Sequence, residues 1–367
     1  MMEYDVESIA GHFRLDGRLV NGEPFGSGHI NDTFSLTCQK DGREKRYLLQ
    51  RINHRVFKNP VAMMENIRRV TAHIRLKLQD QDDELARRQL TVIDTNDGDA
   101  CFEDKQGNYW RVYNRIEGAI TYNTLESLEL AYEVARMFGW FQRMLTDLPG
   151  PQLNETIVDF HATPKRLKDF LEVLQQDPSN RAKDVKAEID FVLENSEICD
   201  VLLCQVKKGG IPVRITHNDT KINNVMLDAR THKGVCVIDL DTVMPGLSLY
   251  DFGDMVRTAA NPAEEDTREL SRVTMRMSVF EMLVKGFAKE ARAFLTPAER
   301  KCLSFSGKLI TFEQMIRFLC DYLAGDLYYK VHRHRHNLDR SRTQMKMVQS
   351  IIEQEQAMDE IVRNVFQ

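Results

Sequence analysis

The chain has 367 residues, of which 42% are hydrophobic and 29% charged, so we expect a sizeable core beneath an ordinary soluble surface. A formal net charge of −5 disfavours a nucleic-acid binder held by bulk charge, and no apolar run approaches the roughly 18 residues of a membrane-spanning helix. The N-terminus lacks the apolar core of a secretory signal. Seven cysteines without C-x-x-C spacing indicate free thiols in a reducing cytoplasm.

The first third of the chain is rich in predicted strands. Gly26 and Gly28 lie between apolar segments and predict a hairpin turn, whose backbone N–H groups are suited to lie over phosphates; a plain turn is the alternative. Strands are expected at residues 46–52, 90–93 and 109–116. Asn59-Pro60 opens a helix over residues 61–78, which carries apolar residues at helical spacing.

After residue 118 the pattern turns helical, which predicts a lobe boundary there. Helices are expected at 125–145, from Thr163, and within 181–206. Capping-box spacing occurs at residues 296–299 and again at 311–314, where it predicts the start of a helix that runs through residue 323. The basic segment 330–342 reads as a solvated face, with phosphate or RNA binding as the alternative.

The polar loop at residues 217–224 carries the chemistry. It precedes two short predicted strands, 225–227 and 235–238, which form a hairpin that ends on Asp239. Because a hairpin brings its outer ends together, we expect Asp219, Lys221, Asn224 and Asp239 to converge. A base, oxygen ligands for magnesium and one cation are what phosphoryl transfer requires. A surface hairpin without chemistry is the alternative.

This loop resembles the catalytic loop of kinases. His217, Asp219 and Asn224 match the pattern H-x-D-x-x-x-x-N, and Asp239 follows on the second strand where kinases place a metal-binding aspartate. Lys221 matches a lysine that many protein kinases carry. Asp-Phe-Gly at residues 251–253 matches a kinase metal-binding motif in letters only, because the spacing from Asn224 assigns the metal position to Asp239. We expect Asp251 to begin the next helix and brace the loop.

The same resemblance assigns the nucleotide side. Kinases place a lysine on the third strand, and this chain lacks it. Strand parity favours Arg51 as the phosphate-binding cation, with Leu49 facing adenine and Gln50 as the runner-up. Glu65 on the following helix is expected to pair with that cation, a solvated surface glutamate being the alternative. The backbone from Tyr113 to Glu117 is the expected hinge for adenine.

Longer segments resemble the aminoglycoside phosphotransferase and choline kinase superfamily, and within it the bacterial N-acetylhexosamine 1-kinases. They are GHINDTF (28–34), LLQRIN (48–53), THNDTKINNVM (216–226), VIDLDTVMPGLSLYDFGD (237–254) and RFLCDYLAGDLYY (317–329). The resemblance implies an α+β, protein-kinase-like fold with two lobes. Residues 1–117 would form a nucleotide-binding lobe of antiparallel strands with one helix, and residues 118–367 a mainly helical lobe for catalysis and substrate binding.

The resemblance also implies ATP-dependent phosphorylation of the anomeric O1 hydroxyl of N-acetylglucosamine or N-acetylgalactosamine by a cytoplasmic monomer or weak homodimer. Asp219 would accept or orient the O1 proton, and Lys221 would stabilise the transferring group. The remaining roles are magnesium binding by Asn224 and Asp239, with Asp241 as a helper, and sugar binding by Arg317 and Tyr328, with His29 and Asp32 as weaker candidates.

Other acceptors and a different class of function stay open. Choline needs an aromatic cage and aminoglycosides need carboxylates, whereas the C-terminal segment is basic; homoserine is not excluded. A catalytically inactive kinase fold used as a binding module is supported by the missing strand lysine. The combination of Asp219, Lys221, Asn224 and Asp239 speaks against it. Preferences between hexosamines and between ATP and GTP are not determined by the sequence.

Overall fold

The structure, a computed structural model, describes residues 4–26, 31–78 and 87–367. The chain forms two compact units. Unit 1 comprises Met1–Ile120, Asp147–Val158 and Met226–Pro245, and unit 2 comprises Thr121–Thr146, Asp159–Val225 and Gly246–Gln367. The single lobe boundary between residues 117 and 118 stays a prediction. Unit 1 extends to Ile120 and takes in two later segments of the chain as well.

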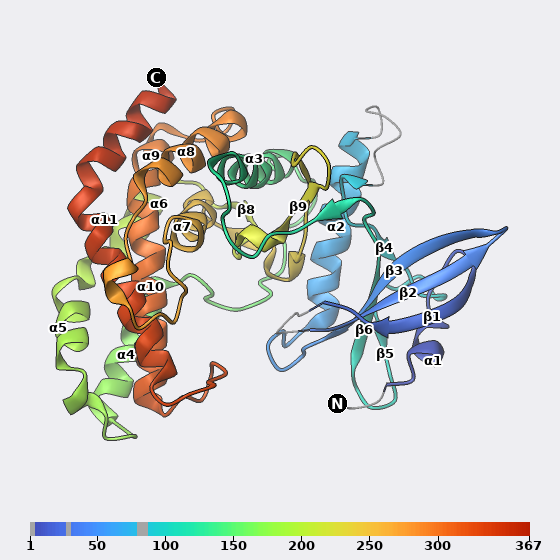
Figure 1. The fold of residues 1–367 in the computed structure, drawn as a ribbon, viewed down its shortest axis with the longest axis horizontal. Coiled ribbons are helices and arrows are strands. Elements are labelled where there is room, and N and C mark those ends of the chain that lie inside the picture. Colours follow the sequence, from blue (N-terminus) through green and yellow to red (C-terminus); the bar gives the residue numbers. More distant parts are fainter. Residues whose placement is uncertain (1–3, 27–30, 79–86) are drawn as a thin grey trace. The chain divides into compact units, whose positions relative to one another are not determined.

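Unit 1 is built on an antiparallel sheet in the order β1-β2-β3-β6-β4, with β5 also paired to β6. Figure 1 draws its first strands in blue, with α2 in lighter blue. The predicted hairpin around residues 26–33 is confirmed as β1 and β2, in which Pro24 lies opposite Phe34. The elements of this unit are α1 (Val6–Ala10), β1 (Arg18–Pro24), β2 (Asp32–Lys40), β3 (Arg43–Ile52), α2 (Pro60–Leu78), β4 (Val92–Ile93), β5 (Phe102–Glu103), β6 (Tyr109–Asn114), β7 (Ala119–Ile120), β9 (Val225–Asp228) and β10 (Gly234–Val237).

One face of this sheet is apolar and packs around α1. Alternate residues of each strand point to this face, because successive side chains in a strand point to opposite sides. Leu49 and Trp110 belong to this core and are fully buried in it, together with Leu36 and Phe13. The prediction that Leu49 faces adenine is therefore wrong, since Leu49 fills the core on the α1 side.

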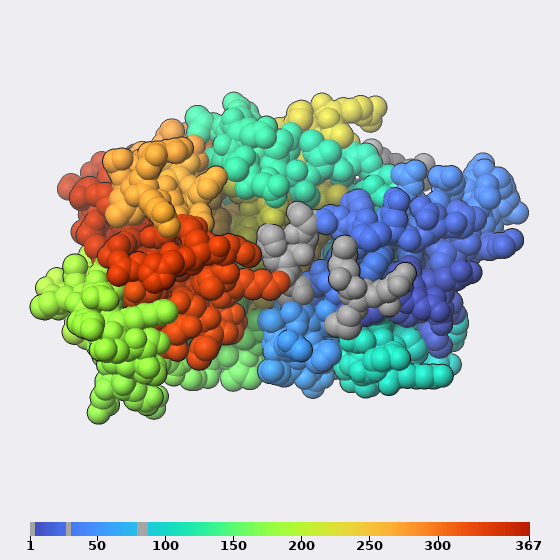
Figure 2. All heavy atoms as spheres, turned by 60° about the horizontal axis from the view of Figure 1, so that its bottom comes forward, coloured from blue at the N-terminus to red at the C-terminus, as the bar shows by residue number. Residues whose placement is uncertain are grey.

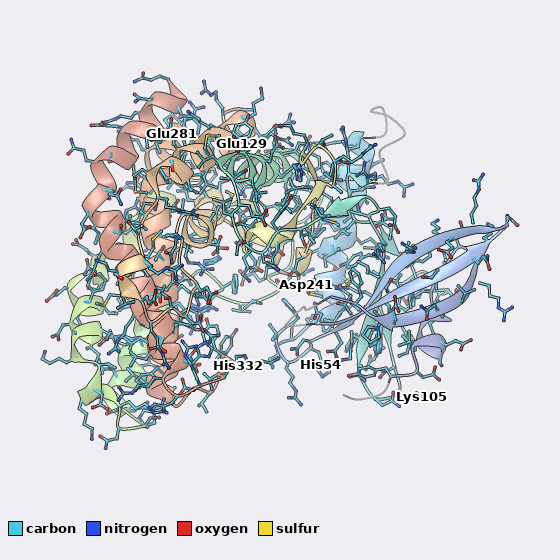
Figure 3. The ribbon with its side chains drawn as sticks, in the orientation of Figure 1. His54, Lys105, Glu129, Asp241, Glu281 and His332 are labelled. Atoms are coloured by element: carbon cyan, nitrogen blue, oxygen red, sulfur yellow. The ribbon has the colours of Figure 1, made fainter. Side chains whose placement is uncertain are left out.

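The opposite face carries a polar row, in which Arg111 is buried and Thr33 and Gln50 are partly buried. Thr33, Gln50 and Arg111 lie opposite one another on β2, β3 and β6. Gln50 donates to the Thr33 hydroxyl (3.0 Å) and accepts from Arg111 Nε (3.0 Å). The Arg111 guanidinium donates to both carboxylate oxygens of Asp241, which Figure 3 labels. Burial lowers the pKa of Arg111, but the carboxylate of Asp241 raises it above its ordinary value.

Helix α2 joins the later segments of unit 1 to the first. Asn66 is fully buried on α2 and donates to the carbonyl oxygens of Asn154 (2.8 Å) and Val243 (3.0 Å). The side-chain oxygen of Asn66, Oδ1, accepts from the backbone amide of Asn154 (2.9 Å). One side chain thus satisfies three backbone groups from two segments, which leaves none of these groups buried without a partner.

Unit 2 is mainly helical. Helices α10 and α11 lie side by side (Figure 1), and α10 also packs against α7 and α4, while α3 packs on α8. At the crossing of α7 and α10, a Cβ atom on Gly253 would collide with the carbonyl oxygen of Ser306, so glycine permits this close approach. The elements are α3 (Leu128–Met144), α4 (Thr163–Gln176), α5 (Lys186–Glu194), α6 (Val201–Lys207), β8 (Arg214–Thr216), α7 (Ser248–Ala259), α8 (Met277–Ala291), α9 (Pro297–Lys301), α10 (Leu303–Ala324) and α11 (His336–Phe366); the short strand β11 (Met244–Gly246) belongs partly to each unit.

The two predicted capping boxes have different outcomes. Thr296 and Glu299 form the predicted box at the start of α9. The second box is wrong, because α10 already begins at Leu303 and Thr311 lies inside it. There the Thr311 hydroxyl donates to the carbonyl oxygen of Gly307, one turn earlier. Among the described residues, no helix combines the length and the apolar character needed to cross a membrane.

We predict that unit 1 depends on the buried pair of Arg111 and Asp241. Arg111→Leu leaves a buried carboxylate uncompensated and should lower the free energy of unfolding by about 3–5 kcal/mol. Arg111→Leu combined with Asp241→Leu should restore part of that loss. Chemical denaturation measures both, with Arg46→Leu at a half-exposed surface pair as the control, expected within about 0.5 kcal/mol of the parent. A single variant as stable as this control would contradict the prediction.

Candidate active site

The loop after β8 is held by a buried carboxylate. The backbone amides of His217 (2.9 Å) and Asn218 (2.7 Å) both donate to Asp251, which lies near the start of α7. The Thr220 hydroxyl donates to the Asp251 carbonyl oxygen (2.6 Å). Asn218 adopts a left-handed conformation with φ of 65°, which asparagine tolerates better than most residues. This geometry agrees with the predicted bracing role of Asp251.

Asp251 is itself supported from α3. Gln142 donates its side-chain N–H to Asp251 and accepts from the Ser248 hydroxyl (2.7 Å). Burial raises the pKa of Asp251 above its ordinary value. The His217 side chain and the backbone amides that donate to Asp251 act in the opposite direction. The imidazole of His217 is fully buried and meets the rings of Phe138 and Phe141 edge-on. We therefore assign His217 to the core rather than to the chemistry.

The Asp219 carboxylate lies beside a cation and an amide. Lys221 Nζ lies 2.8 Å from Asp219 Oδ1, and Asn224 Nδ2 donates to the Asp219 carbonyl oxygen (2.8 Å) and more weakly to its Oδ2 (3.3 Å). Burial lowers the pKa of Lys221, but Asp219 raises it above its ordinary value, so the amine stays charged. The structure thus brings Asp219, Lys221 and Asn224 together within unit 2.

The side-chain amide of Asn224 is oriented by a hydrogen bond. Because Nδ2 donates to the Asp219 carbonyl oxygen, Oδ1 remains as the acceptor end of this side chain. Oxygen ligands of this kind suit magnesium. Asp239, the second predicted ligand, belongs to unit 1 and has a left-handed backbone with φ of 59°. No cluster of three His, Cys, Asp or Glu side chains able to hold a metal occurs within the described ranges.

The predicted helper Asp241 has a structural partner instead. Its carboxylate accepts from the guanidinium of Arg111 and from Asn31 Nδ2 (2.8 Å). Asn31 also accepts from the Asn53 amide (3.0 Å), so the end of the glycine hairpin is joined to the same carboxylate. We assign Asp241 to holding the segment that carries Asp239, because protein donors already contact both of its oxygens.

Arg51 and Glu65 have other partners than expected. Arg51 lies opposite Trp110 on the α1 side of the sheet, where it donates to Asp32 (2.7 Å). Glu65 is exposed and accepts from Asn154 (3.3 Å). The register places Gln50, the runner-up, on the face that carries Arg111, and Arg51 on the opposite face. The nucleotide-binding roles of Arg51 and Glu65, and the sugar-binding role of Asp32, stay predictions.

The hinge region is largely occupied by protein contacts. Asn114 donates its amide to Thr91 and Arg115 to Arg46 (both 3.1 Å). The carbonyl oxygen of Glu117, the predicted nucleotide contact, accepts from Arg87 Nε (3.0 Å). Ile116 lies between Arg115 and Glu117 in the sequence. Within the described part of the chain, its backbone amide and carbonyl make no hydrogen bond.

The glycine hairpin is described only in part. Gly26 has φ of 76°, which favours glycine, and a Cβ atom there would meet open space. Gly28 and His29, predicted to bind nucleotide and sugar respectively, lie outside the described residues.

Arg317 lies among aromatic rings and acidic side chains on α10. Its guanidinium carbon is 5.4 Å from the ring centre of Phe160 and 5.9 Å from that of Tyr329. Nη1 lies 4.0 Å from Glu313. Tyr328, the predicted partner of Arg317, is 65% exposed and its ring contacts Tyr329. Figure 2 shows this C-terminal region, in red, at the surface of unit 2.

Several charged residues near the site were given no role by sequence reasoning. Asp254 is buried, accepts from the Thr220 amide (2.9 Å) and pairs with Arg257 (2.9 Å). Glu313 is buried and contacts His161 (2.9 Å). The i,i+3 spacing of Asp254 and Arg257 on a helix is a weak signal. No local pattern links His161 to Glu313, which lie 152 residues apart in the chain.

The chain matches the model of the phosphotransferase enzyme family over residues 21–274. An aminoglycoside phosphotransferase from Alicyclobacillus acidocaldarius has a similar structure, with a TM-score of 0.63 and 12% identity, covering 100% of this chain and 97% of that one. Spectinomycin phosphotransferase in complex with ADP and spectinomycin is similar with a TM-score of 0.56 and 13% identity, covering 96% of this chain and 97% of that one. Choline kinase from Cryptosporidium parvum is similar with a TM-score of 0.56 and 12% identity, covering 92% of this chain and 91% of that one.

These likenesses confirm the predicted α+β, protein-kinase-like fold class. At such low identity, they show the fold alone. The family model extends over more than half of the chain and includes the loop of Asp219 and the strand that precedes Asp239. The superfamily resemblance is thereby confirmed: this chain belongs to the phosphotransferase enzyme family.

Proposed function

We propose that this protein transfers the γ-phosphoryl group of ATP to the anomeric O1 hydroxyl of N-acetylglucosamine or N-acetylgalactosamine. The observation that carries the transfer step is the carboxylate of Asp219, which lies on a braced loop between Lys221 and Asn224. A carboxylate next to a fixed cation suits a group that orients a hydroxyl while negative charge moves beside it.

The charges around Arg317 favour a neutral acceptor. Glu313 already contacts His161, and Asp254 pairs with Arg257, which also contacts Glu265 (2.8 Å). A cationic aminoglycoside would thus find carboxylates that protein cations have already neutralised. It would also meet the guanidinium of Arg317, and like charges repel at close range.

The aromatic rings point to the same acceptor class. Phe160 and Tyr329 have the guanidinium of Arg317 near their faces. A quaternary ammonium such as choline binds through those same faces, so Arg317 competes with it. A sugar instead presents hydroxyl and amide oxygens to an arginine and apolar C–H groups to a ring. The resemblance to the N-acetylhexosamine 1-kinases supplies the choice of sugar, and we keep Tyr328, His29 and Asp32 as proposed contacts.

In the proposed step, Asp219 accepts the proton of the O1 hydroxyl as that oxygen attacks the γ-phosphorus. The new O1–P bond forms while the bond from the γ-phosphorus to the bridging oxygen breaks, and ADP leaves with that oxygen. Lys221 lies next to Asp219 and is placed to stabilise charge on the transferring group. Magnesium, when bound to Asn224 and Asp239, would neutralise phosphate charge.

On the nucleotide side, we propose that adenine pairs with the backbone of Ile116 rather than with the carbonyl of Glu117. That carbonyl already accepts from Arg87, whereas the Ile116 groups have no partner among the described residues. A free amide and carbonyl on one residue provide the donor and acceptor that an adenine edge needs.

The first test is ADP release with ATP and magnesium in the presence of single acceptors. We expect turnover with N-acetylgalactosamine or N-acetylglucosamine, and phosphorus NMR should place the phosphate on O1. Galactose, choline, homoserine and kanamycin serve as the comparison set, because galactose lacks the N-acetyl group and the other three represent the alternative acceptor classes. Faster turnover of choline or kanamycin than of both hexosamines would overturn the proposal.

We predict that Asp219→Asn lowers kcat by about 10²–10⁴-fold, since the amide cannot accept the proton. ATP affinity, measured by calorimetry, should stay within about threefold of the parent, because this carboxylate is assigned to the acceptor. Asp190→Asn, at a half-exposed surface pair on α5, is the matched control and should be neutral. Near-parental turnover of Asp219→Asn would remove Asp219 from the proton transfer.

We predict that Arg317→Gln raises the KM for the sugar by about 10- to 100-fold, because a charge-assisted hydrogen bond contributes about 1.5–3 kcal/mol. The KM for ATP should not change. Arg272→Gln is the control, since that side chain is 65% exposed and pairs with an exposed glutamate, Glu269, at 3.5 Å. An unchanged sugar KM in Arg317→Gln would place the sugar elsewhere.

A further inference from the structure

A histidine outside every motif contacts the active loop. His161 lies just before α4, and its side chain is only 7% exposed. Its Nδ1 lies 2.9 Å from Glu313 Oε1, and its Nε2 lies 3.2 Å from the carbonyl oxygen of Asn218. Asn218 is the residue that precedes Asp219. A single imidazole therefore joins α10 to the loop that carries the proposed base.

The two contacts of His161 decide its protonation. A backbone carbonyl oxygen only accepts hydrogen bonds, so Nε2 must carry a proton to bond Asn218. Glu313 is disposed to be ionised, because its Oε2 accepts from the Thr163 hydroxyl (2.7 Å) and Arg317 lies 4.0 Å from its Oε1. A carboxylate likewise only accepts, so Nδ1 is protonated as well. His161 is then an imidazolium in a buried ion pair.

The bond to Asn218 acts on a conformation that needs support. Asn218 is left-handed, and its backbone amide donates to Asp251. The Asn218 carbonyl belongs to the next peptide, whose nitrogen is that of Asp219. Asp251 and His161 thus hold the two successive peptides, and together they set the direction in which the Asp219 side chain leaves the loop.

We propose that His161 is a positioning residue of the transfer reaction: its imidazolium, held by Glu313, donates to the Asn218 carbonyl oxygen and keeps Asp219 aligned with the acceptor hydroxyl. The assignment of Asp219 as the base rests on the proposed function. The contact of His161 with the loop does not.

The proposal predicts a particular pH dependence. Burial lowers the pKa of His161, but Glu313 raises it above its ordinary value. Asp254 acts in the same direction as Glu313 and Arg317 in the opposite one, and Tyr250 packs against the ring. A group with a raised pKa is charged at low pH and loses its proton as pH rises through that pKa. The imidazolium should therefore persist beyond the ordinary histidine range.

Amide variants separate the two ring nitrogens. His161→Gln places an N–H near the position of Nε2 and should keep kcat within about fivefold of the parent. His161→Asn places its N–H near the position of Nδ1, loses the bond to Asn218, and should lower kcat by about 10- to 100-fold at nearly unchanged KM values. His334→Gln, at an exposed histidine, is the control. Equal losses in the Gln and Asn variants would reduce His161 to a packing role and overturn the proposal.

Glu313→Gln tests the charge. It removes the main group that raises the pKa of His161, so the alkaline fall in kcat should move to lower pH than in the parent. Nitrogen-15 NMR of histidine-labelled protein should show one imidazole with both nitrogens protonated above pH 7, and that signal should vanish in His161→Gln. A singly protonated His161 at neutral pH would overturn the proposed charge state.

Hydrogen exchange in the loop tests the role of His161 independently of the acceptor that the enzyme uses. Hydrogen exchange of the amides of His217 and Asn218 should become faster in His161→Asn than in His161→Gln, whatever acceptor the enzyme uses. If no hexosamine is turned over while NMR and exchange behave as expected, the sugar assignment fails and the His161 contact stands. If sugars are turned over but exchange is unchanged in His161→Asn, the positioning role fails.

Discussion

A buried carboxylate holds the active loop in place. Where the chain turns sharply after β8, backbone amides point inward and need acceptors, because a buried N–H without a partner costs free energy. Asp251 accepts from two of them and is itself fixed by Gln142. Without this acceptor, the backbone amides of His217 and the left-handed Asn218 would lose their partner. The direction of the Asp219 side chain depends on this arrangement.

In unit 1 a buried charged side chain likewise holds a segment in place, but there it is a cation. There a buried cation, Arg111, binds Asp241 and fixes the segment that carries Asp239, while Gln50 completes the row across the sheet. The kinase strand lysine is absent, yet a cation is still present on the neighbouring strand β6. An ion pair of this kind is costly to break from one side only, so both partners are expected to be needed together.

Charge pairing also shapes the acceptor side. Glu313 contacts His161, and Asp254 and Glu265 both contact Arg257, so each of these carboxylates already has a basic side chain of the protein beside it. Pairing of this kind disfavours cationic acceptors and tolerates neutral ones. It also couples the acceptor side to the loop, since Glu313 contacts both Arg317 and His161.

The sequence by itself determined the features whose residues lie close together along the chain. The loop from His217 to Asn224 and its hairpin follow from spacing, because a few residues and one turn leave little freedom. Helix α7, expected to begin at Asp251, begins at Ser248. Spacing could not choose between Arg51 and Gln50, because the face of the sheet that each side chain occupies depends on which side of β3 the α1 core covers. Only the tertiary structure decided the long-range partners: Arg111 with Asp241, 130 residues apart, and His161 with Glu313, 152 residues apart. Such pairs leave no periodic trace in the chain, because packing rather than local geometry brings them together.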